Sequence, residues 1–279
     1  MTDFKEIIYI LAMFNNIKNS IKKYCMLKDD IMIIHEKLLN FAKTKAYSYI
    51  MNLDILKIYN NNISVLLVGS TATGLCNENS DVDICLLCKD EIFRTISKDT
   101  SWINGRPTEI NLEKIQLHYY AISIENIESK LIILDDITFY VYSTAISLND
   151  NSGLFEILKV QISDEKLNVR RKEMAIDTLV RRRRALNGVL SELDDYVVRI
   201  DVMNEIIKHI LKVTALKDNI PFDPRKRPYK TGLSGATGYL ISENINRAIS
   251  LISEASYFKN KESIKLFEKY IDDCILLIK

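Results

Sequence analysis

The sequence of 279 residues predicts an α+β protein, in which a domain of mixed sheet and helices (residues 1–160) is followed by a helical bundle domain (residues 161–279). Short apolar runs of strand length lie in the first part of the chain. Apolar residues three and four positions apart, among many charges, fill residues 170–216 and 235–279 instead. Three of the four prolines gather in residues 218–233, which we expect to form a loop between these helical stretches.

Two amphipathic helices are expected at the start of the chain, over residues 3–26 and 29–59. In both segments the apolar residues recur at helical spacing, so one face of each helix is apolar. Two strands are expected next, at Ser64–Val68 and Val82–Leu87, because both are short apolar runs bounded by small or polar residues. These strands begin a sheet against which the helices can pack.

A hairpin is predicted from the strand patterns of Thr108–Leu112 and Ile115–Ile124, which are joined by a two-residue turn. Residues 125–147 are ambiguous, since their pattern is compatible with a helix, a short strand or both. The segment Leu148–Leu158 combines Asn-Asp-Asn-Ser-Gly turn chemistry with an apolar run that follows it. In the second part, Ser234 is a candidate N-cap for the helix expected over residues 235–279.

Composition narrows the class of protein. The formal net charge is +1, so the overall charge does not indicate that the whole protein binds nucleic acid. Local basic patches could still do so. Five cysteines, an odd number unevenly spread, do not form the pattern of a disulfide framework, and we expect a reducing cytoplasm. The start of the chain lacks the layout of a signal peptide, and no apolar run reaches the roughly 18 residues that span a bilayer. We therefore expect a cytoplasmic protein with no membrane partner.

The stretch from Leu66 to Cys88, LLVGSTATGLCNENSDVDICLLC, carries the chemistry. A strand that ends in Gly69-Ser70 can turn sharply, and its backbone N–H groups and the Ser70 hydroxyl can hold phosphate oxygens, helped by a helix that begins near residues 71–74. Asp81 and Asp83 are two positions apart on a strand, so both carboxylates point to the same face. Because like charges repel there, we expect a divalent cation such as Mg²⁺ to hold them together.

This arrangement resembles the signature of the DNA polymerase β-like nucleotidyltransferase superfamily. Gly69-Ser70 is followed, after about ten residues, by Ser80-Asp81-Val82-Asp83, with apolar strands on both sides. In layout the chain is most similar to bacterial two-domain nucleotidyltransferases of the aminoglycoside and lincosamide type, because YSTAISLNDNSGLFEIL resembles the end of their catalytic domain. The resemblance covers residues 64–160, and beyond them it concerns architecture only.

The resemblance implies transfer of a nucleoside monophosphate from an NTP, with ATP as the expected donor, and two Mg²⁺ ions. Asp81 and Asp83 would be metal ligands and catalytic residues. The residues expected to bind the nucleotide are Gly69, Ser70, Thr71, Ser80 and two basic residues of the proline-rich loop, Arg227 and Lys230.

The third acidic residue of the family pattern is less clear in this chain. Glu109 is the first choice, as a catalytic residue that completes the metal site or acts as general base. Glu113 is the second choice and the pair Asp135-Asp136 the third. His118 lies on the following strand at a position where a carboxylate would be natural. The possibility that no third acid faces Asp81 and Asp83 therefore stays open.

The acceptor stays open between three classes. The first is a hydroxyl of a small molecule, such as an aminoglycoside, which would make the protein an antibiotic-resistance enzyme. The second is RNA or tRNA, bound through basic segments. The third is a toxin–antitoxin type nucleotidyltransferase that modifies RNA or a protein partner. The sequence does not fix the oligomeric state.

Other conspicuous residues favour structural roles. Arg181–Arg184 span a full helical turn and favour a solvated face, with Glu192, Asp194 and Asp195 as expected partners. Cys85 and Cys88 favour packing in the core over redox or metal chemistry. Trp102, His35 and His209 are also expected to be packing or ordinary helix residues.

Overall fold

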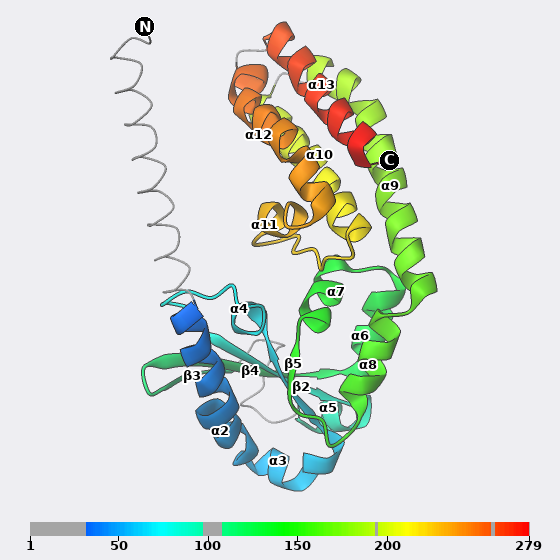
Figure 1. Cartoon of the computed structure of the whole chain (residues 1–279). Helices are drawn as coiled ribbons and strands as arrows, with labels where there is room; N and C mark the ends of the chain where they lie inside the picture. The colour runs from blue at the N-terminus through cyan, green and yellow to red at the C-terminus, as the bar shows by residue number, and fades with distance from the viewer. Residues whose placement is uncertain (1–31, 97–107, 193–194, 258–259, 279) are drawn as a thin grey trace, which may run out of the picture. The chain divides into compact units, whose positions relative to one another are not determined.

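The computed structural model describes residues 32–96, 108–192, 195–257 and 260–278, which are drawn as ribbon in Figure 1. The helix expected over residues 3–26 and Trp102 lie outside the described residues. The chain divides into two compact units. The first consists of Met1–Asn126 and Thr144–Glu156, and the second of Ile127–Ser143 and Ile157–Lys279. The domain boundary predicted at residue 160 stays a prediction.

A five-stranded mixed sheet forms the centre of the first unit, in the order β3-β4-β2-β1-β5 (Figure 1). Its strands are β1 (Ser64–Val68), β2 (Val82–Cys88), β3 (Thr108–Leu112), β4 (Ile115–Ser123) and β5 (Ile146–Asn149). β2 and β4 run parallel, and the other neighbouring pairs are antiparallel. The two predicted strands and the predicted hairpin are confirmed. The hairpin turn has positive φ at both Glu113 and Lys114, which suits the twist of the strands that it joins.

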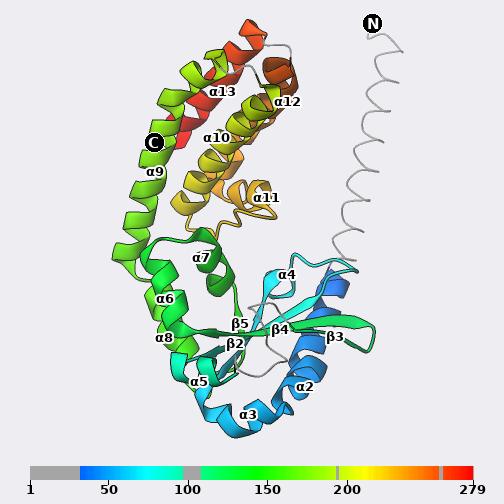
Figure 2. The same ribbon diagram turned by 180° about the vertical axis from the view of Figure 1, so that it is seen from behind.

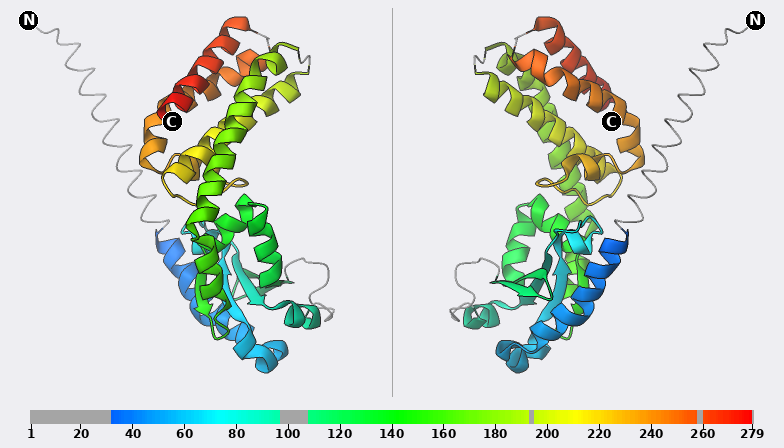
Figure 3. Two further views of the ribbon diagram at one scale, coloured as in Figure 1. Left: turned by 90° about the vertical axis from the view of Figure 1, so that its right-hand side faces the viewer. Right: turned by 90° about the vertical axis from the view of Figure 1, so that its left-hand side faces the viewer.

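Helices from the start of the described chain cover one face of this sheet (Figure 3, blue). The strands contribute alternate side chains to the shared core, among them Val65 and Leu67, as expected for a period of two. The helix predicted over residues 29–59 is interrupted by a turn at residues 52–53. Its described parts are residues 32–41, η1 (Ala42–Ala46), α2 (Tyr47–Met51), α3 (Asp54–Tyr59) and η2 (Asn60–Asn62).

The ambiguous residues 125–147 contain two helices and one strand. These are α6 (Ile124–Ile132), α7 (Asp136–Ser143) and β5. Earlier in the chain, a further helix, α5 (Asp90–Ile96), follows β2. The predicted turn after β5 leads into α8 (Leu154–Ile162). The Asp150 carboxylate accepts hydrogen bonds from the backbone N–H groups of Phe155 and Glu156 at 3.2 and 3.1 Å and from the Ser64 hydroxyl. Asp150 therefore joins this helix start to β1.

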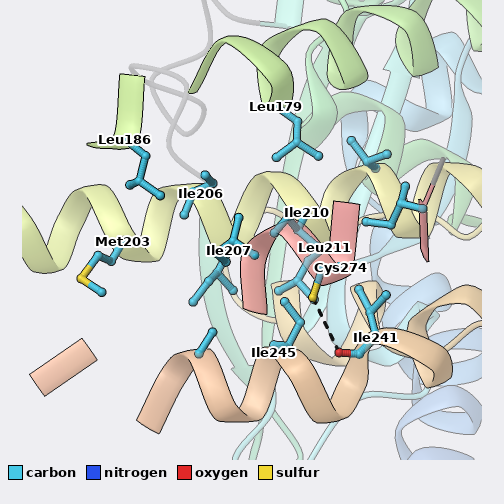
Figure 4. Close-up of a cluster of buried hydrophobic side chains, with 14 of the residues drawn as sticks. Leu179, Leu186, Met203, Ile206, Ile207, Ile210, Leu211, Ile241, Ile245 and Cys274 are labelled. Atoms are coloured by element: carbon cyan, nitrogen blue, oxygen red, sulfur yellow. Dashed lines mark hydrogen bonds between the residues drawn. The ribbon is translucent and has the colours of Figure 1, made fainter. Parts of the chain in front are cut away.

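The second unit is a helical bundle, as predicted (Figure 2). Its long helices are α9 (Glu165–Glu192), α10 (Tyr196–Lys217), α12 (Ala236–Tyr257) and α13 (Lys261–Ile278), and the short α11 (Pro228–Gly232) lies in the proline-rich loop. Figure 4 shows that α10 supplies a row of apolar side chains to the core, which includes Ile207 and Leu211. They pack with Leu179 of α9 and with Ile241 and Ile245 of α12.

Two of the four arginines at residues 181–184 pair with acids other than the expected ones, of which the side chains of Glu192 and Asp194 lie outside the description. Arg181 pairs with Asp177 of the same helix at 3.0 Å. Arg183 pairs with Asp272 of α13 through two contacts of 2.7 Å. Asp195, an expected partner, accepts a hydrogen bond from the backbone N–H of Val197 and caps α10 instead. The prediction of these partners was wrong for Asp195, because a helix start needs an acceptor at that position.

The cysteines of the sheet are packed in the core, as predicted. Cys85 and Cys88 are both fully buried, and burial raises the pKa of the Cys88 thiol to about 12. None of the four cysteines that the structure describes forms a disulfide: Cys76, Cys85, Cys88 and Cys274. Within the described ranges, every helix is too short or too polar to cross a membrane.

The N-cap of α12 differs from the prediction. The helix begins at Ala236, and the carboxylate that caps it comes from Asp218, just after α10. Asp218 accepts hydrogen bonds from the backbone N–H of Thr237 at 2.9 Å and from its hydroxyl at 2.6 Å. Ser234 donates to the Thr231 carbonyl at 2.9 Å instead. The prediction of Ser234 as N-cap was therefore wrong, because a residue distant in sequence occupies that role.

We expect Asp218→Ala to lower the free energy of unfolding of the second unit by about 1–2 kcal/mol, since it removes the cap of a buried helix start. Ser234→Ala is the matched control and should change it by less than about 0.5 kcal/mol. Urea denaturation monitored by circular dichroism measures both values. Equal losses for the two variants would contradict this assignment of the cap.

Candidate active site

Two aspartates lie at the start of β2, on the face that its core residues leave free. Asp81 precedes the strand and Asp83 is its second residue, and both side chains are partly exposed. Val82 and Ile84 alternate with them and are fully buried. The period of a strand thus places the two carboxylates together, as the sequence predicts.

The Gly69-Ser70 turn lies directly beside Asp83. The antiparallel register pairs Val68, the last residue of β1, with Asp83, and Gly69 follows with a positive φ of 76°. A Cβ atom on Gly69 would lie 2.2 Å from Asp83 Oδ2, so only glycine allows this approach. The predicted helix is the single turn α4 (Gly69–Ala72). With one turn the helix dipole adds little, and phosphate binding by the backbone N–H groups of this turn stays a prediction.

Thr71 and Ser80 shape the loop between the turn and the aspartates. The Thr71 side chain is buried, and its hydroxyl donates to the Asp81 carbonyl at 3.2 Å. The Ser80 hydroxyl accepts from the backbone N–H of Asn77 at 2.8 Å, in a turn that directly precedes Asp81. Both side chains are thus engaged with the protein, and their predicted contact with nucleotide stays a prediction.

His35, which we expected to be an ordinary helix residue, holds this loop from outside. Its Nε2 lies 3.0 Å from the Thr71 carbonyl oxygen. A carbonyl oxygen only accepts, so Nε2 carries the proton and donates. The residue belongs to the helical segment 32–41, and it therefore connects the helix layer to the backbone beside Gly69 and Ser70.

We expect His35→Ala to lower the free energy of unfolding by about 1 kcal/mol, because the Thr71 carbonyl loses its donor. If this loop binds nucleotide as the resemblance implies, the change should also raise KM for the nucleotide more than it lowers kcat, because the loop shifts while Asp81 and Asp83 keep their positions. His35→Gln, which keeps a donor, should restore part of both values. Denaturation curves and steady-state kinetics measure them. An unchanged KM together with a lowered free energy of unfolding would show that His35 contributes to stability only and does not support nucleotide binding.

His118 on β4 lies next to both aspartates. It is the parallel pairing partner of Asp83 and the antiparallel partner of Glu109 on β3. Its Nδ1 lies 3.0 Å from Asp81 Oδ2 and 3.4 Å from Asp83 Oδ1, and its side chain is 14% exposed. One ligand atom from each of the three residues lies within 4.8 Å of the others. The cluster is thus compact enough to hold one cation.

Glu109, the first choice for the third acid, lies on the far side of His118. Its Oε1 is 3.9 Å from His118 Nε2, its side chain is 60% exposed, and Gln116 donates to its Oε2 at 3.4 Å. Its catalytic role stays a prediction. The second choice, Glu113, pairs with Lys45 at 2.8 Å on the hairpin turn.

The third choice, Asp135-Asp136, lies in the second unit, where both carboxylates have partners. Asp135 caps α7 through the backbone N–H of Thr138 at 2.8 Å, and Asp136 pairs with Lys212 and Arg171. The predicted phosphate contacts Arg227 and Lys230 also belong to the second unit, next to and within α11. Their contact with nucleotide stays a prediction.

The donor set of the aspartate cluster fits a divalent cation. Two carboxylates and one imidazole nitrogen are all common metal ligands, and a cation would offset the repulsion between Asp81 and Asp83. The close approach of Gly69 leaves the backbone of the turn beside the same carboxylates. Triphosphate oxygens could then contact the turn and the cation together.

The sheet carries a Gly-Ser turn and an Asp-x-Asp pair at adjacent strand ends, which is the arrangement that the sequence resemblance to nucleotidyltransferases implies. Residues 52–148 match the family model described as Nucleotidyltransferase domain, and they include the turn, both aspartates, Glu109 and His118. This segment belongs to that family, and the chain carries a nucleotidyltransferase domain of the DNA polymerase β-like superfamily. The protein is accordingly an enzyme of the nucleotidyltransferase class.

Among solved structures, the chain is similar to a nucleotidyltransferase-like protein from Exiguobacterium sibiricum 255-15. The TM-score is 0.46 and the sequence identity 12%, over 79% of this chain and 72% of that chain. No curated protein matches the chain.

Proposed function

We propose that the protein transfers a nucleoside monophosphate from an NTP, with ATP as donor and Mg²⁺ as the cation of the sequence prediction, to a hydroxyl of an acceptor. The observation that carries this proposal is the approach of Gly69 to Asp83, which sets the Gly69-Ser70 turn, our proposed phosphate-binding turn, against a pair of carboxylates. Packing alone does not explain this arrangement. Asp81 and Asp83 repel each other, and any residue larger than Gly69 would clash with Asp83.

Each group has one task in this proposal. The backbone N–H groups at Gly69 and Ser70 and the Ser70 hydroxyl bind phosphate oxygens, and Asp81 and Asp83 hold the cation site. When bound, divalent cations neutralise the charge that develops on the attacking and leaving oxygens. The acceptor oxygen forms a bond to the α-phosphorus, the bond to the bridging oxygen breaks, and pyrophosphate leaves. The predicted general base is Glu109, exposed on β3 beyond His118, and it would take the hydroxyl proton.

The second unit contains a cavity of about 440 Å³, and its size suggests the class of acceptor that this unit could bind. This volume is in the range of small-molecule sites. The lining combines aromatic and aliphatic side chains with a few polar ones, which are Arg171, Lys172, Asn168, Asn219, Glu165, Ser143 and Ser163.

The charges of this lining bear on the class of acceptor. Lys172 and Glu165 offset each other in this lining, and Arg171 pairs with Asp136, so the cavity offers no net negative charge to attract a polycation. An aminoglycoside, the acceptor that the resemblance in layout suggests, carries several positive charges. Within the small-molecule class, we therefore propose an acceptor that is neutral or anionic, with aminoglycosides as the comparison compounds.

RNA is the second candidate acceptor, and exposed basic residues of the second unit support it. These residues are Arg182, Arg184, Arg225, Lys226 and Lys230. Binding through phosphates would fall steeply as salt rises, because each contact releases counterions. A shallow salt dependence of RNA binding would remove this candidate.

The test is an incubation of the protein with each NTP labelled at the α-phosphate, in Mg²⁺ or Mn²⁺, and with separate pools of RNA, protein, neutral or anionic hydroxyl compounds and aminoglycosides. We expect label transfer from ATP to the neutral or anionic compounds. Transfer to RNA or protein would replace the acceptor proposal. Absence of transfer from every NTP to every pool, with nucleotide binding unaltered in Asp81→Asn, would overturn the proposed function.

A reducing, cytoplasmic setting is part of the proposal. The described cysteines are buried and form no disulfides, and burial raises the pKa of the Cys274 thiol, like that of Cys88, to about 12. Such thiols are poor nucleophiles for disulfide exchange, and the cores that contain them need no oxidation to fold.

A further inference from the structure

We infer that His118 is the third ligand of the cation site and that it makes the site prefer a first-row transition cation, represented by Mn²⁺, over Mg²⁺. The inference rests on the proposed function, since it concerns the cation that serves the transfer. It departs from the Mg²⁺ of the sequence prediction because the structure brings an imidazole, and no third carboxylate, into the cluster of described residues that can hold a metal.

The strand register places His118 in this role. Parallel pairing of β2 and β4 sets His118 opposite Asp83, and its Nδ1 lies within 3.4 Å of a carboxylate oxygen of each aspartate. Glu109 is one strand further away, because β3 pairs with the outer side of β4. The imidazole thus lies between the aspartate pair and the acid that the sequence favours.

The other ring nitrogen lies near the kind of acceptor that a ligating histidine uses. A neutral imidazole that coordinates through Nδ1 carries its proton on Nε2, and ligating histidines generally present this N–H to a carboxylate or carbonyl. His118 Nε2 is buried and has no hydrogen-bond partner among the described residues. Glu109 Oε1 lies 3.9 Å from it, so a small side-chain rotation gives Nε2 its acceptor.

The donor set decides between cations. Mg²⁺ is a hard cation that keeps oxygen ligands and water, whereas transition cations accept an imidazole nitrogen readily. Two carboxylates with one imidazole suit a cation that tolerates both ligand types. An aspartate at residue 118 would supply a third oxygen and restore a site for Mg²⁺.

Mn²⁺ binding to the full-length protein tests the preference. The loss of the free Mn²⁺ electron paramagnetic resonance signal gives its Kd, and competition with Mg²⁺ gives the second Kd. We expect His118→Asp to reduce the ratio of the Mg²⁺ Kd to the Mn²⁺ Kd by about tenfold or more, on the scale of ligand-sphere changes. An unchanged ratio in a folded His118→Asp protein would overturn the inference.

A spectroscopic measurement on the wild type does not depend on any variant. Electron spin echo envelope modulation of the Mn²⁺ complex should show coupling to a ¹⁴N nucleus, and a Mn²⁺ complex without this coupling would exclude imidazole ligation. The proposed function is tested separately by Asp81→Asn. If that variant binds Mn²⁺ like the wild type, the aspartate pair is not the cation site and the proposed function fails as well. If only the ¹⁴N coupling is missing, the inference alone fails.

Discussion

Asp81→Asn and Asp83→Asn should each reduce nucleotidyl transfer by about a thousandfold or more, since losing a cation ligand costs several kcal/mol of transition-state stabilisation. Both carboxylates converge on one point, and a neutral amide cannot replace the charge there. The fold should survive, because both side chains are partly exposed and removing one of two repelling charges relieves strain. Label transfer from the α-phosphate and thermal melts measure the two effects.

Asp54→Asn is the matched control for these variants. It makes the same chemical change in the first unit at a side chain that is 93% exposed and pairs only locally with Lys57. Its transfer rate and melting temperature should stay near those of the wild type. A severe loss of melting temperature in Asp81→Asn or Asp83→Asn would show that the aspartates are structural, and it would contradict their assignment to the cation site.

Gly69→Ala should abolish transfer and destabilise the first unit. The added Cβ would lie 2.2 Å from Asp83 Oδ2, so the carboxylate or the turn has to move. The positive φ of 76° adds a conformational cost of about 1 kcal/mol or more. Both effects act on the same two elements, the turn and the aspartate, and we expect activity to fall further than stability.

Gly153→Ala separates these two causes. Gly153 also has a positive φ, of 69°, but a Cβ there would meet no atom within 4 Å. This variant should therefore lose only the conformational term of about 1 kcal/mol and keep its transfer rate. Urea denaturation and label transfer compare the two variants. If both variants lost the same stability and Gly69→Ala stayed active, the claim that a side chain at Gly69 displaces Asp83 would be contradicted.

The sequence was sufficient for the features that local patterns determine. Strands β1 and β2 were predictable because each is a short apolar run, and the period of two placed Asp81 and Asp83 on one face. The hairpin of β3 and β4 followed from its alternating residues. Gly69 was identifiable because a sharp turn after a buried strand needs a residue without a side chain.

Contacts between distant residues could not be predicted in the same way. The adjacency of His118 to the aspartates depends on which strand pairs with β2 and in which register. His35 reaches Thr71 across 36 residues, and Asp218 caps a helix that begins 18 residues later, so neither leaves a short-range signal. The ambiguity of residues 125–147 has a similar origin, since β5 is a strand only because β1 offers it an edge.

The central claim is that the site at Asp81 and Asp83 transfers a nucleotidyl group. The most direct test follows the α-phosphate and the γ-phosphate of ATP separately. ATP labelled at the α-phosphate and, in a parallel reaction, at the γ-phosphate is incubated with the acceptor pools and either the wild type or Asp81→Asn. The account predicts that the wild type moves the α-label to the acceptor and releases the γ-label as pyrophosphate. Asp81→Asn should do neither. Transfer of the γ-label to the acceptor, or equal α-label transfer by Asp81→Asn, would contradict it.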